Sequence, residues 1–356
     1  MLSTLKYATQ LNPLTLDAHA TNAARHLMRE GSSANTEASY RSAIRYWAAW
    51  YELRYGRPFG LPVAPTAVVQ FIVDHAQRIG DHGLIWEMPD ALDAELVRLG
   101  VKTRLGAPAL NTVLLRLSVL SKAHDVQGHP NPCAAPAVKA LIAKTRSAYA
   151  KRGAVPKKKK ALTKNPFEAM LQTCDDSLRG VRDRALLLFA WSSGGRRRSE
   201  VTQATLENVV PMDGGYIYSL VYSKTNQTGL DRTDNAKPIV GQAARALARW
   251  LSVSGVTSGP IFRRIRRGDV IGEPLAPAAV RAIVRERCLA AGLDEGFSAH
   301  SLRSGFITEA ARQDVPLGEI MSLTGQTSVR TVMGYYQAGR MTESRALDLL
   351  SENDTP

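Results

Sequence analysis

A dense run of basic residues divides the chain near its middle. Between Lys144 and Lys164 the sequence holds nine basic residues and no acidic one, and Gly153 and Pro156 interrupt any helix there. Such a run is usually solvated, so it predicts a linker. The 356 residues also suffice for two domains at roughly 100 to 200 residues each. We therefore expect an N-terminal domain over 1–150, a basic linker over 151–163 and a C-terminal domain over 164–356.

The net charge indicates a polyanionic partner. The chain has 46 Lys and Arg residues against 32 Asp and Glu residues, which gives a formal charge of +14. Lys and Arg bind polyanions by neutralising phosphates and releasing counterions, and this favours nucleic acid over a membrane surface. The basic residues of the linker either remain solvated or follow a phosphate backbone; they are Lys151, Arg152, Lys157, Lys158, Lys159 and Lys160.

Composition also excludes several classes of protein. A hydrophobic content of 44% is enough to form a core in each domain, so the chain is not disordered throughout. No stretch approaches about 18 uninterrupted apolar residues, and the first residues lack the pattern of a secretory signal, so we expect neither a membrane span nor secretion. Cys133, Cys174 and Cys288 lie far apart and provide neither a disulfide framework nor a CxxC-type metal site. We expect a reducing, cytoplasmic location.

The first half of the chain has the pattern of a helical domain. Its longest helix is expected to begin after Asn35 and Thr36, both suitable N-caps, and to end at Gly56 and Pro58. Trp47, Trp50 and Tyr51 are interpreted as core residues. We expect no strand before residue 200, and further helices over 65–79, 89–99, 108–124 and 135–149.

The second half combines helices with a small sheet. The turn at 213–215 precedes a segment rich in β-formers over 216–222, and a short strand over 237–240 would pair with it. Helical patterns cover the remainder, over 167–173, 181–191, 243–251, 277–290 and from 301 onward.

Two fragments of the second half carry cations at breaks between elements. The fragment GGRRRSEV (194–201) places three arginines where one helix gives way to the next, and the N-terminal amides of a helix attract an anion. The alternative is a solvated basic turn. The fragment YSKTNQTG places Lys224 after the predicted strand, where a lysine is ordinarily a surface residue.

Two further fragments carry histidine, arginine and tyrosine. In SAHSLRSGFITEAA, His300 and Arg303 lie three residues apart and share one helix face. In LTGQTSVRTVMGYYQ, Tyr335 follows Gln326 by nine residues and Tyr336 comes next. Each fragment alone is common, because HxxR pairs are frequent and adjacent tyrosines usually pack.

Taken in order, these fragments resemble the active-site set of the tyrosine recombinase (phage integrase) family, and in particular its Cre-like members. The residues that carry the resemblance are Arg197, Lys224, His300, Arg303 and Tyr335. YWAAWY (46–51) and RWLSVSGV (249–256) also resemble Cre-like sequence, so the likeness runs from about residue 15 to 350. The family pattern selects Arg197 among the three arginines because it lies three residues before Glu200. Arg196 and Arg198 are then interpreted as phosphate-contacting or solvated.

The resemblance implies a mainly α, two-domain DNA clamp: a helical core-binding domain and a mostly helical catalytic domain with a small antiparallel sheet. It implies a site-specific recombinase that cleaves and rejoins duplex DNA through a 3′-phosphotyrosine, with no cofactor, metal or ATP. Tyr335 would be the nucleophile, and Arg197 and Arg303 would bind the scissile phosphate. Glu200 would orient the arginine or the histidine; the alternative is a carboxylate favoured by the helix dipole. His300 would act as a base or hydrogen-bond partner of the phenol, and Lys224 as the acid for the leaving 5′-hydroxyl.

Position 326 departs from the family pattern. Most members carry His there and the Cre-like ones carry Trp, whereas this chain has Gln. An amide can donate a hydrogen bond to a phosphate oxygen but cannot transfer a proton in the working pH range. By analogy with Trp, an uncharged N–H donor suffices, and we include Gln326 in the catalytic set.

The resemblance also implies partners. The substrate would be double-stranded DNA with an inverted-repeat site, in a prokaryotic, phage or plasmid context. The segment 341–350 has the pattern of a short amphipathic helix, which in this family docks on a neighbouring protomer. The protein would be a monomer in solution and a homo-tetramer on two DNA sites. Packing of this helix on its own protomer is the alternative.

Three other functions remain as alternatives. A type IB topoisomerase or a telomere-resolving enzyme shares this site logic. A site-specific DNA-binding protein with an impaired catalytic centre is suggested by Gln326 alone. A polyanion-binding module without any active site explains the charge but not the ordered motifs.

Overall fold

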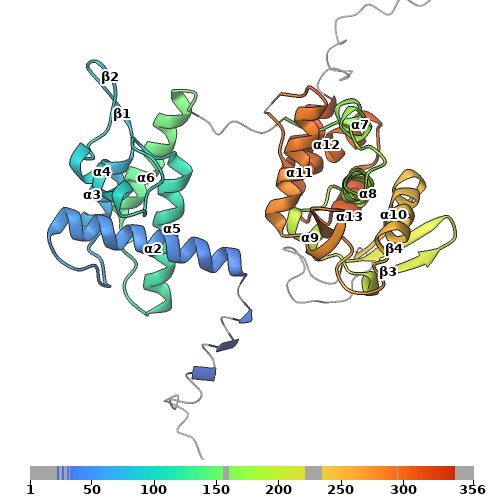
Figure 1. Ribbon diagram of the computed structural model, residues 1–356. Helices are drawn as coiled ribbons and strands as arrows, with labels where there is room; N and C mark the ends of the chain where they lie inside the picture. Colours follow the sequence, from blue (N-terminus) through green and yellow to red (C-terminus); the bar gives the residue numbers. More distant parts are fainter. Residues whose placement is uncertain are drawn as a thin grey trace, which may run out of the picture. The chain divides into compact units, whose positions relative to one another are not determined.

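The computed structural model divides the chain into two compact units, Met1–Pro156 and Lys157–Pro356 (Figure 1). The structure describes residues 33–154, 160–220, 235–294 and 296–340, with a few more between 22 and 31. Three sequence-based expectations lie outside the described residues: those for Lys157 to Lys159, for Lys224 and for the tail 341–350. Among the helices of the described residues, none is both long and apolar enough to cross a bilayer.

Unit 1 is a helical domain, as the sequence predicts. Its elements are α2 (Ala34–Tyr55), α3 (Pro65–His75), β1 (Arg78–Gly80), β2 (Gly83–Ile85), α4 (Asp90–Arg98), α5 (Leu110–Val126), the short helix η1 (Pro132–Ala134) and α6 (Pro136–Lys151).

The start of α2 differs from the prediction. Ser33 is the N-cap, and its hydroxyl accepts a hydrogen bond from the Thr36 amide at 3.2 Å. Asn35 and Thr36 therefore lie in the first turn, because Ser33 can supply the same capping oxygen two residues earlier. The end agrees with the prediction, since Gly56 closes the helix in a left-handed conformation.

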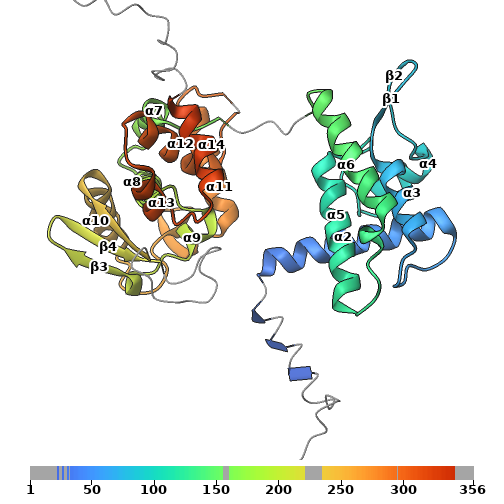
Figure 2. The same ribbon diagram turned by 180° about the vertical axis from the view of Figure 1, so that it is seen from behind.

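The expectation that no strand precedes residue 200 is wrong. β1 and β2 pair antiparallel and form a hairpin that projects from the helices (Figures 1 and 2). Each strand has only three residues, and Ile79 and Leu84 are 69% and 58% exposed. Such short strands with no buried face lack the alternation of polar and apolar residues by which a strand is detected.

Aromatic side chains fill the core of unit 1. Trp47 and Trp50 are fully buried, as predicted, and the Trp47 ring stacks on Phe71 with a centroid distance of 3.8 Å. The indole of Trp50 donates to the Asp74 carboxylate at 2.9 Å, so the polar end of the ring is satisfied. Tyr51 is only partly buried, at the edge of the cluster.

Residues at both ends of the predicted linker over 151–163 belong to the two units. Lys151 is the last residue of α6. Arg152 stacks on the Tyr149 ring at 4.3 Å and donates to the Gln77 carbonyl at 3.1 Å. At the other end, Leu162 is fully buried in unit 2. Arg152 thus has partners within unit 1, so the basic run is not solvated along its whole length.

Unit 2 combines helices with small antiparallel sheets. Its helices are α7 (Lys164–Gln172), α8 (Leu178–Ser192), α9 (Arg198–Thr202), α10 (Gly241–Ser254), α11 (Pro277–Ala290), α12 (Ala299–Arg312), α13 (Leu317–Thr324) and α14 (Val329–Arg340). Its strands are β3 (Val209–Met212), β4 (Gly215–Ser219), β5 (Ala236–Val240), β6 (Arg263–Arg266) and β7 (Val270–Pro274).

The largest sheet of unit 2 has the order β3-β4-β5. β4 and β5 correspond to the predicted strands and pair with Tyr216 opposite Ile239. This sheet lies beside α10 at one side of the unit, and α7, α11 and α12 lie at the other (Figure 1). Phe189, Trp250 and Phe262 are fully buried in the core. The observed fold is therefore mainly α with small antiparallel sheets, as expected.

A close backbone approach fixes the start of unit 2 against α12. The Leu162 amide donates to the Ser301 carbonyl at 3.0 Å. A Cβ atom at Gly305 would lie 2.0 Å from the Leu162 carbonyl oxygen, a distance that no real Cβ tolerates. Glycine at this position is thus required for α12 to contact the segment that enters the unit.

We predict that Gly305→Ala destabilises unit 2. Alanine favours a helix over glycine, but the added methyl group must displace backbone, and such overpacking costs about 1–3 kcal/mol. Thermal unfolding of the full chain measures the change. The matched control is Gly318→Ala in α13, where a Cβ meets nothing within 4 Å. Equal melting temperatures for the two variants would contradict the prediction.

Candidate active site

Two glycines bring the arginine box, Arg196 to Arg198, against the helices that carry the other candidate residues. Gly194 and Gly195 have φ values of 95° and 68°, which L side chains rarely adopt. A Cβ at Gly194 would lie 2.4 Å from the Leu323 carbonyl oxygen, and one at Gly195 would lie 2.4 Å from the Arg303 Cα. The Gly-Gly break therefore packs directly on α12 and on the end of α13.

Arg197 and Glu200 form the start of α9. Arg197 is the N-cap residue, and its backbone amide donates to Glu200 Oε2 at 3.0 Å. Its Nη1 also lies 2.5 Å from Glu200 Oε1, so one carboxylate binds both the backbone amide and the guanidinium of Arg197. Burial opposes ionisation of Glu200, but the charges of Arg196 and Arg197, together with the hydrogen bonds from Arg197, lower its pKa. Glu200 thus orients Arg197, whose side chain is 29% exposed.

The HxxR residues lie in the first turns of α12. Ser298 caps this helix, and its own amide donates to the Ser301 hydroxyl at 2.9 Å. Arg303 is only 3% exposed. Its Nη1 donates to the Gly195 carbonyl at 3.3 Å and its Nη2 to the Thr324 carbonyl at 2.6 Å. Burial and the charges of Arg196 and Arg197 lower the pKa of Arg303.

His300 and Tyr335 meet between α12 and α14. His300 Nε2 lies 3.3 Å from the Tyr335 hydroxyl, within hydrogen-bond distance. Partial burial, together with the charges of Arg303 and Arg197, lowers the pKa of His300 from its ordinary value of 6.5. A neutral imidazole is therefore favoured near neutral pH, and its nitrogen can accept the phenolic proton.

Tyr335 is held by apolar packing. It lies partly buried against a cluster centred on Ile307, Ile320 and Val332, and Tyr336 packs against the same cluster. The contact of its hydroxyl with His300 supports Tyr335 as the nucleophile.

Gln326 is the second residue after α13. Gly325 closes the helix in a left-handed conformation, and the Gln326 amide donates to the Met321 carbonyl at 3.3 Å. The side-chain oxygen Oε1 is buried without a hydrogen-bond partner among the described residues. Gln326 is two residues from Thr324, whose carbonyl binds Arg303. Arg197, His300, Arg303 and Tyr335 thus belong to one constellation. Gln326 lies in the segment that follows α13, and Lys224 lies outside the described residues.

Arg196 does not have the exposed position that the sequence suggested. Its side chain is 1% exposed, Nη2 donates to the Leu323 carbonyl at 2.5 Å, and Nη1 lies 3.7 Å from Glu200 Oε2. A side chain buried to this extent is not solvated, so the solvated alternative for Arg196 is wrong. Its neighbour Arg198 is the exposed arginine of the box. Lys160 is also exposed, and it pairs with Asp294.

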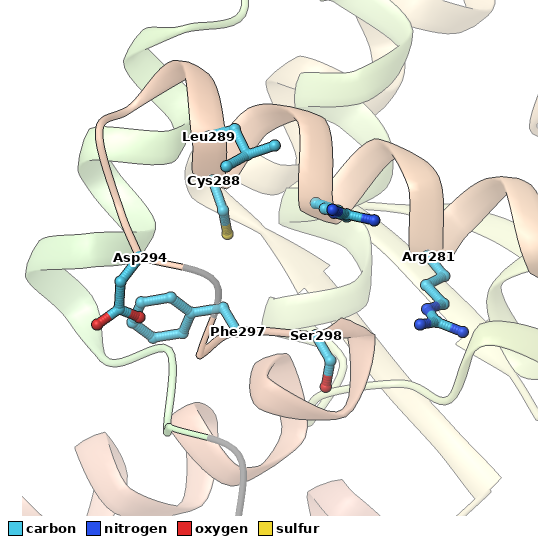
Figure 3. Close-up of a pocket in the computed structure, with 7 residues that line it drawn as sticks. Arg281, Cys288, Leu289, Asp294, Phe297 and Ser298 are labelled. Carbon is cyan, nitrogen blue, oxygen red and sulfur yellow. The ribbon is translucent and has the colours of Figure 1, made fainter. Parts of the chain in front are cut away.

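A pocket of about 200 Å³ lies beside the start of α12 and contains none of the predicted catalytic residues (Figure 3). It is lined by Arg281, Arg285, Cys288, Leu289, Asp294, Phe297 and Ser298. Burial raises the pKa of the Cys288 thiol to about 11, so this thiol stays protonated and is no nucleophile. Within the described residues, no group of three or more His, Cys, Asp or Glu side chains could hold a metal ion.

Comparison with known proteins places this constellation in a family. Residues 160–341, more than half of the chain, match the phage integrase family. An integrase/recombinase XerD homolog from Selenomonas ruminantium is 32% identical over 248 residues, which cover 67% of this chain and 71% of the relative. Recombinase Cre from Escherichia phage P1 is 24% identical over 376 positions, covering 99% of this chain and all of Cre.

Solved structures show the same fold. The Tn1549 transposon integrase in complex with transposon right end DNA superposes with a TM-score of 0.57 at 13% identity, covering 92% of this chain and 96% of that one. A lambda integrase dimer bound to a core site gives a TM-score of 0.54 at 18% identity, covering 94% and 96%. The family match spans Arg197, His300, Arg303 and Tyr335, and the chain therefore belongs to the phage integrase family of tyrosine recombinases.

Proposed function

We propose that this protein is a site-specific DNA recombinase that cleaves and rejoins duplex DNA through a covalent 3′-phosphotyrosine at Tyr335. The observation that carries the proposal is the contact between His300 Nε2 and the Tyr335 hydroxyl, beside the arginines of the site. A phenol next to a neutral histidine and two guanidinium groups has the parts that phosphoryl transfer requires.

Tyr335 and His300 would perform the attack. The phenolic oxygen attacks the scissile phosphorus while its proton moves to His300, and the bond from phosphorus to the 5′ oxygen breaks. The strand then carries a 3′-phosphotyrosine and a 5′-hydroxyl. Because a phosphodiester is replaced by another phosphodiester, the reverse attack by a 5′-hydroxyl reseals DNA without ATP.

The two arginines would stabilise the charge that develops on the phosphate. Guanidinium groups bind phosphate oxygens with bidentate, charge-assisted hydrogen bonds, and partial burial strengthens such interactions. Arg197 is the more exposed of the two. Both terminal nitrogens of Arg303 already donate to backbone carbonyls, so a bidentate contact from Arg303 requires at least one of these bonds to be exchanged.

Two further residues complete the proposed chemistry. Lys224 would protonate the departing 5′ oxygen, a role that rests on the family pattern because the residue lies outside the described part of the chain. Gln326 would donate an amide hydrogen bond to a non-bridging phosphate oxygen. Its position two residues from the Thr324 carbonyl, which binds Arg303, supports this assignment.

The partner would be duplex DNA with an inverted-repeat site. Unit 1 would be the core-binding domain and unit 2 the catalytic domain, with four protomers on two sites. A formal charge of +14 favours such a partner. The exposed cations Lys151 and Arg198 are suited to phosphate contacts, whereas Arg152 has partners within unit 1.

We predict that Tyr335→Phe abolishes covalent attachment to DNA, because it removes only the attacking oxygen. The matched control is Tyr336→Phe, which removes the neighbouring hydroxyl and should leave attachment intact. Incubation with a supercoiled plasmid carrying DNA from the gene's own neighbourhood, followed by denaturing electrophoresis, detects the adduct. An adduct that persists in Tyr335→Phe would overturn the assignment.

We predict that His300 stays neutral down to pH values below 6.5. Its lowered pKa means that the base-competent form predominates above the folded-state pKa and is lost only as the pH falls through it. NMR titration of the imidazole in the full chain measures the midpoint, and Arg197→Gln should raise it by removing one nearby cation. Arg249→Gln on α10 is the control, because Arg249 pairs with Asp176 instead. A wild-type midpoint above 6.5 would refute the prediction.

We predict that deleting residues 340–356 spares DNA binding but weakens pairing of two sites, because the tail would dock on a neighbouring protomer. Gel-shift affinity for one site and the yield of recombined product measure the two steps. If the truncated protein recombines as fast as the full chain, docking between protomers is excluded.

A further inference from the structure

The C-terminal end of α13 is surrounded by cations. The last four carbonyls of an α-helix have no partner within the helix, so they must be satisfied from outside. In α13, the Met321 carbonyl accepts from the backbone amides of Gly325 and Gln326. The three carbonyls that follow each accept from a charged side chain: Ser322 from Lys237 at 2.5 Å, Leu323 from Arg196 at 2.5 Å, and Thr324 from Arg303 at 2.6 Å.

The three cations come from different elements and are all buried. Lys237 lies on β5, Arg196 precedes α9, and Arg303 lies on α12. Their residues are 1%, 2% and 3% exposed. Cations are favoured at a helix C-terminus, where the dipole and the unpaired carbonyls concentrate negative charge. Charge-assisted hydrogen bonds are also about twice as strong as neutral ones, so the end of α13 is held firmly.

This helix end leads directly into the reacting residues. Gly325 and Gln326 follow Thr324 immediately, and α14 with Tyr335 begins three residues later. Tyr335 packs against the apolar cluster that contains Ile320 of α13, so a shift of α13 would also disturb the packing of the phenol. A displacement of about 1 Å at a reacting group can lower a rate on the order of 10²-fold.

We propose that Arg196 and Lys237 are positioning residues for the reaction. By binding the Leu323 and Ser322 carbonyls they fix the end of α13, and through it Gln326 and Tyr335, while touching neither the phosphate nor the phenol. The expected effect on the reaction rate rests on the proposed function, whereas the expected effect on the order of α13 does not.

Arg196 has a second contact that must be separated from this role. It lies 3.7 Å from Glu200, which orients Arg197, so loss of Arg196 also perturbs the arginine box. Lys237 reaches α13 from β5 and binds the Ser322 carbonyl. A defect shared by variants at both positions therefore identifies α13 as the common target.

The test uses the full chain and its Arg196→Met and Lys237→Met variants. Each substitution fills the buried site with an unbranched apolar side chain but leaves one carbonyl of α13 without its donor. The first readout, without DNA, is hydrogen exchange of peptides covering 317–340. The second is the single-turnover rate of covalent adduct formation on the plasmid described above, together with the protein concentration that half-saturates the DNA.

We expect faster exchange confined to the end of α13 and the start of α14 in both variants. The rate at saturation should fall by roughly ten- to a hundredfold in both variants. Half-saturation should be unchanged in Lys237→Met, because geometry is lost and DNA contacts are not. Arg196→Lys should recover part of the rate, because it keeps a cation near the Leu323 carbonyl.

The matched control is Arg287→Met. Arg287 is also mostly buried and also donates to a carbonyl at a helix end, that of Thr173 after α7, at 2.6 Å. The Arg287→Met variant should have a lower melting temperature but no selective change in the hydrogen exchange of peptides 317–340.

The proposal would be overturned if both test variants showed wild-type hydrogen exchange and a wild-type rate of adduct formation. It would also be overturned if their loss of rate were only as large as that of Arg287→Met. If one of the two Met variants fails to fold, the other still tests the proposal. A wild-type protein that forms no adduct would instead refute the proposed function, and the exchange result would still decide the positioning role.

Discussion

The active site depends on the buried guanidinium of Arg303 more than on any other single group. From α12 it reaches the Gly195 carbonyl beside the arginine box and the Thr324 carbonyl at the end of α13. One side chain thus joins three segments that are far apart in the sequence and that carry Arg197, His300 and Gln326. A buried cation with backbone acceptors on both sides allows little displacement, because each lost bond would leave a desolvated charge and an unpaired carbonyl.

Glycines make this junction possible. Gly194 and Gly195 let the backbone of the arginine box approach the Leu323 carbonyl and the Arg303 Cα, and Gly305 lets Leu162 lie against α12. At all three positions a methyl group would meet backbone at a distance below 2.5 Å. The same close packing that brings the cations to the end of α13 also lowers the pKa of His300 through partial burial and neighbouring charge. Fold and reactivity therefore have a common physical origin.

Much of this arrangement could be predicted from sequence because its patterns are local or are shared with a family. Helical periodicity located α3 to α6, and the β-rich segment after the turn at 213–215 located β4. The ordered motifs indicated Arg197, His300, Arg303 and Tyr335, and the structure brings these residues together. The N-cap Ser33 and the hairpin of β1 and β2 were missed because several nearby residues can cap a helix and exposed three-residue strands have no periodicity.

The role of Arg196 could not be predicted because it depends on distant carbonyls. Three consecutive arginines look alike in sequence, and only the folded chain shows that one of them meets Leu323, 127 residues away. The same holds for Lys237. Its sequence pattern is that of an ordinary strand residue, and only the folded structure shows that it donates to the Ser322 carbonyl. A helix end in need of donors appears in the sequence only as a glycine, here Gly325, and the identity of the donors is a property of the tertiary structure.

Whether Tyr335 attacks DNA is decided by mass-spectrometric sequencing of the peptide that remains attached to DNA after the wild-type adduct is denatured and digested with protease and nuclease. We expect a nucleotide remnant on Tyr335, linked through the 3′-phosphate. A remnant on Tyr336 or on any other residue, or a linkage through a 5′-phosphate, would contradict this expectation.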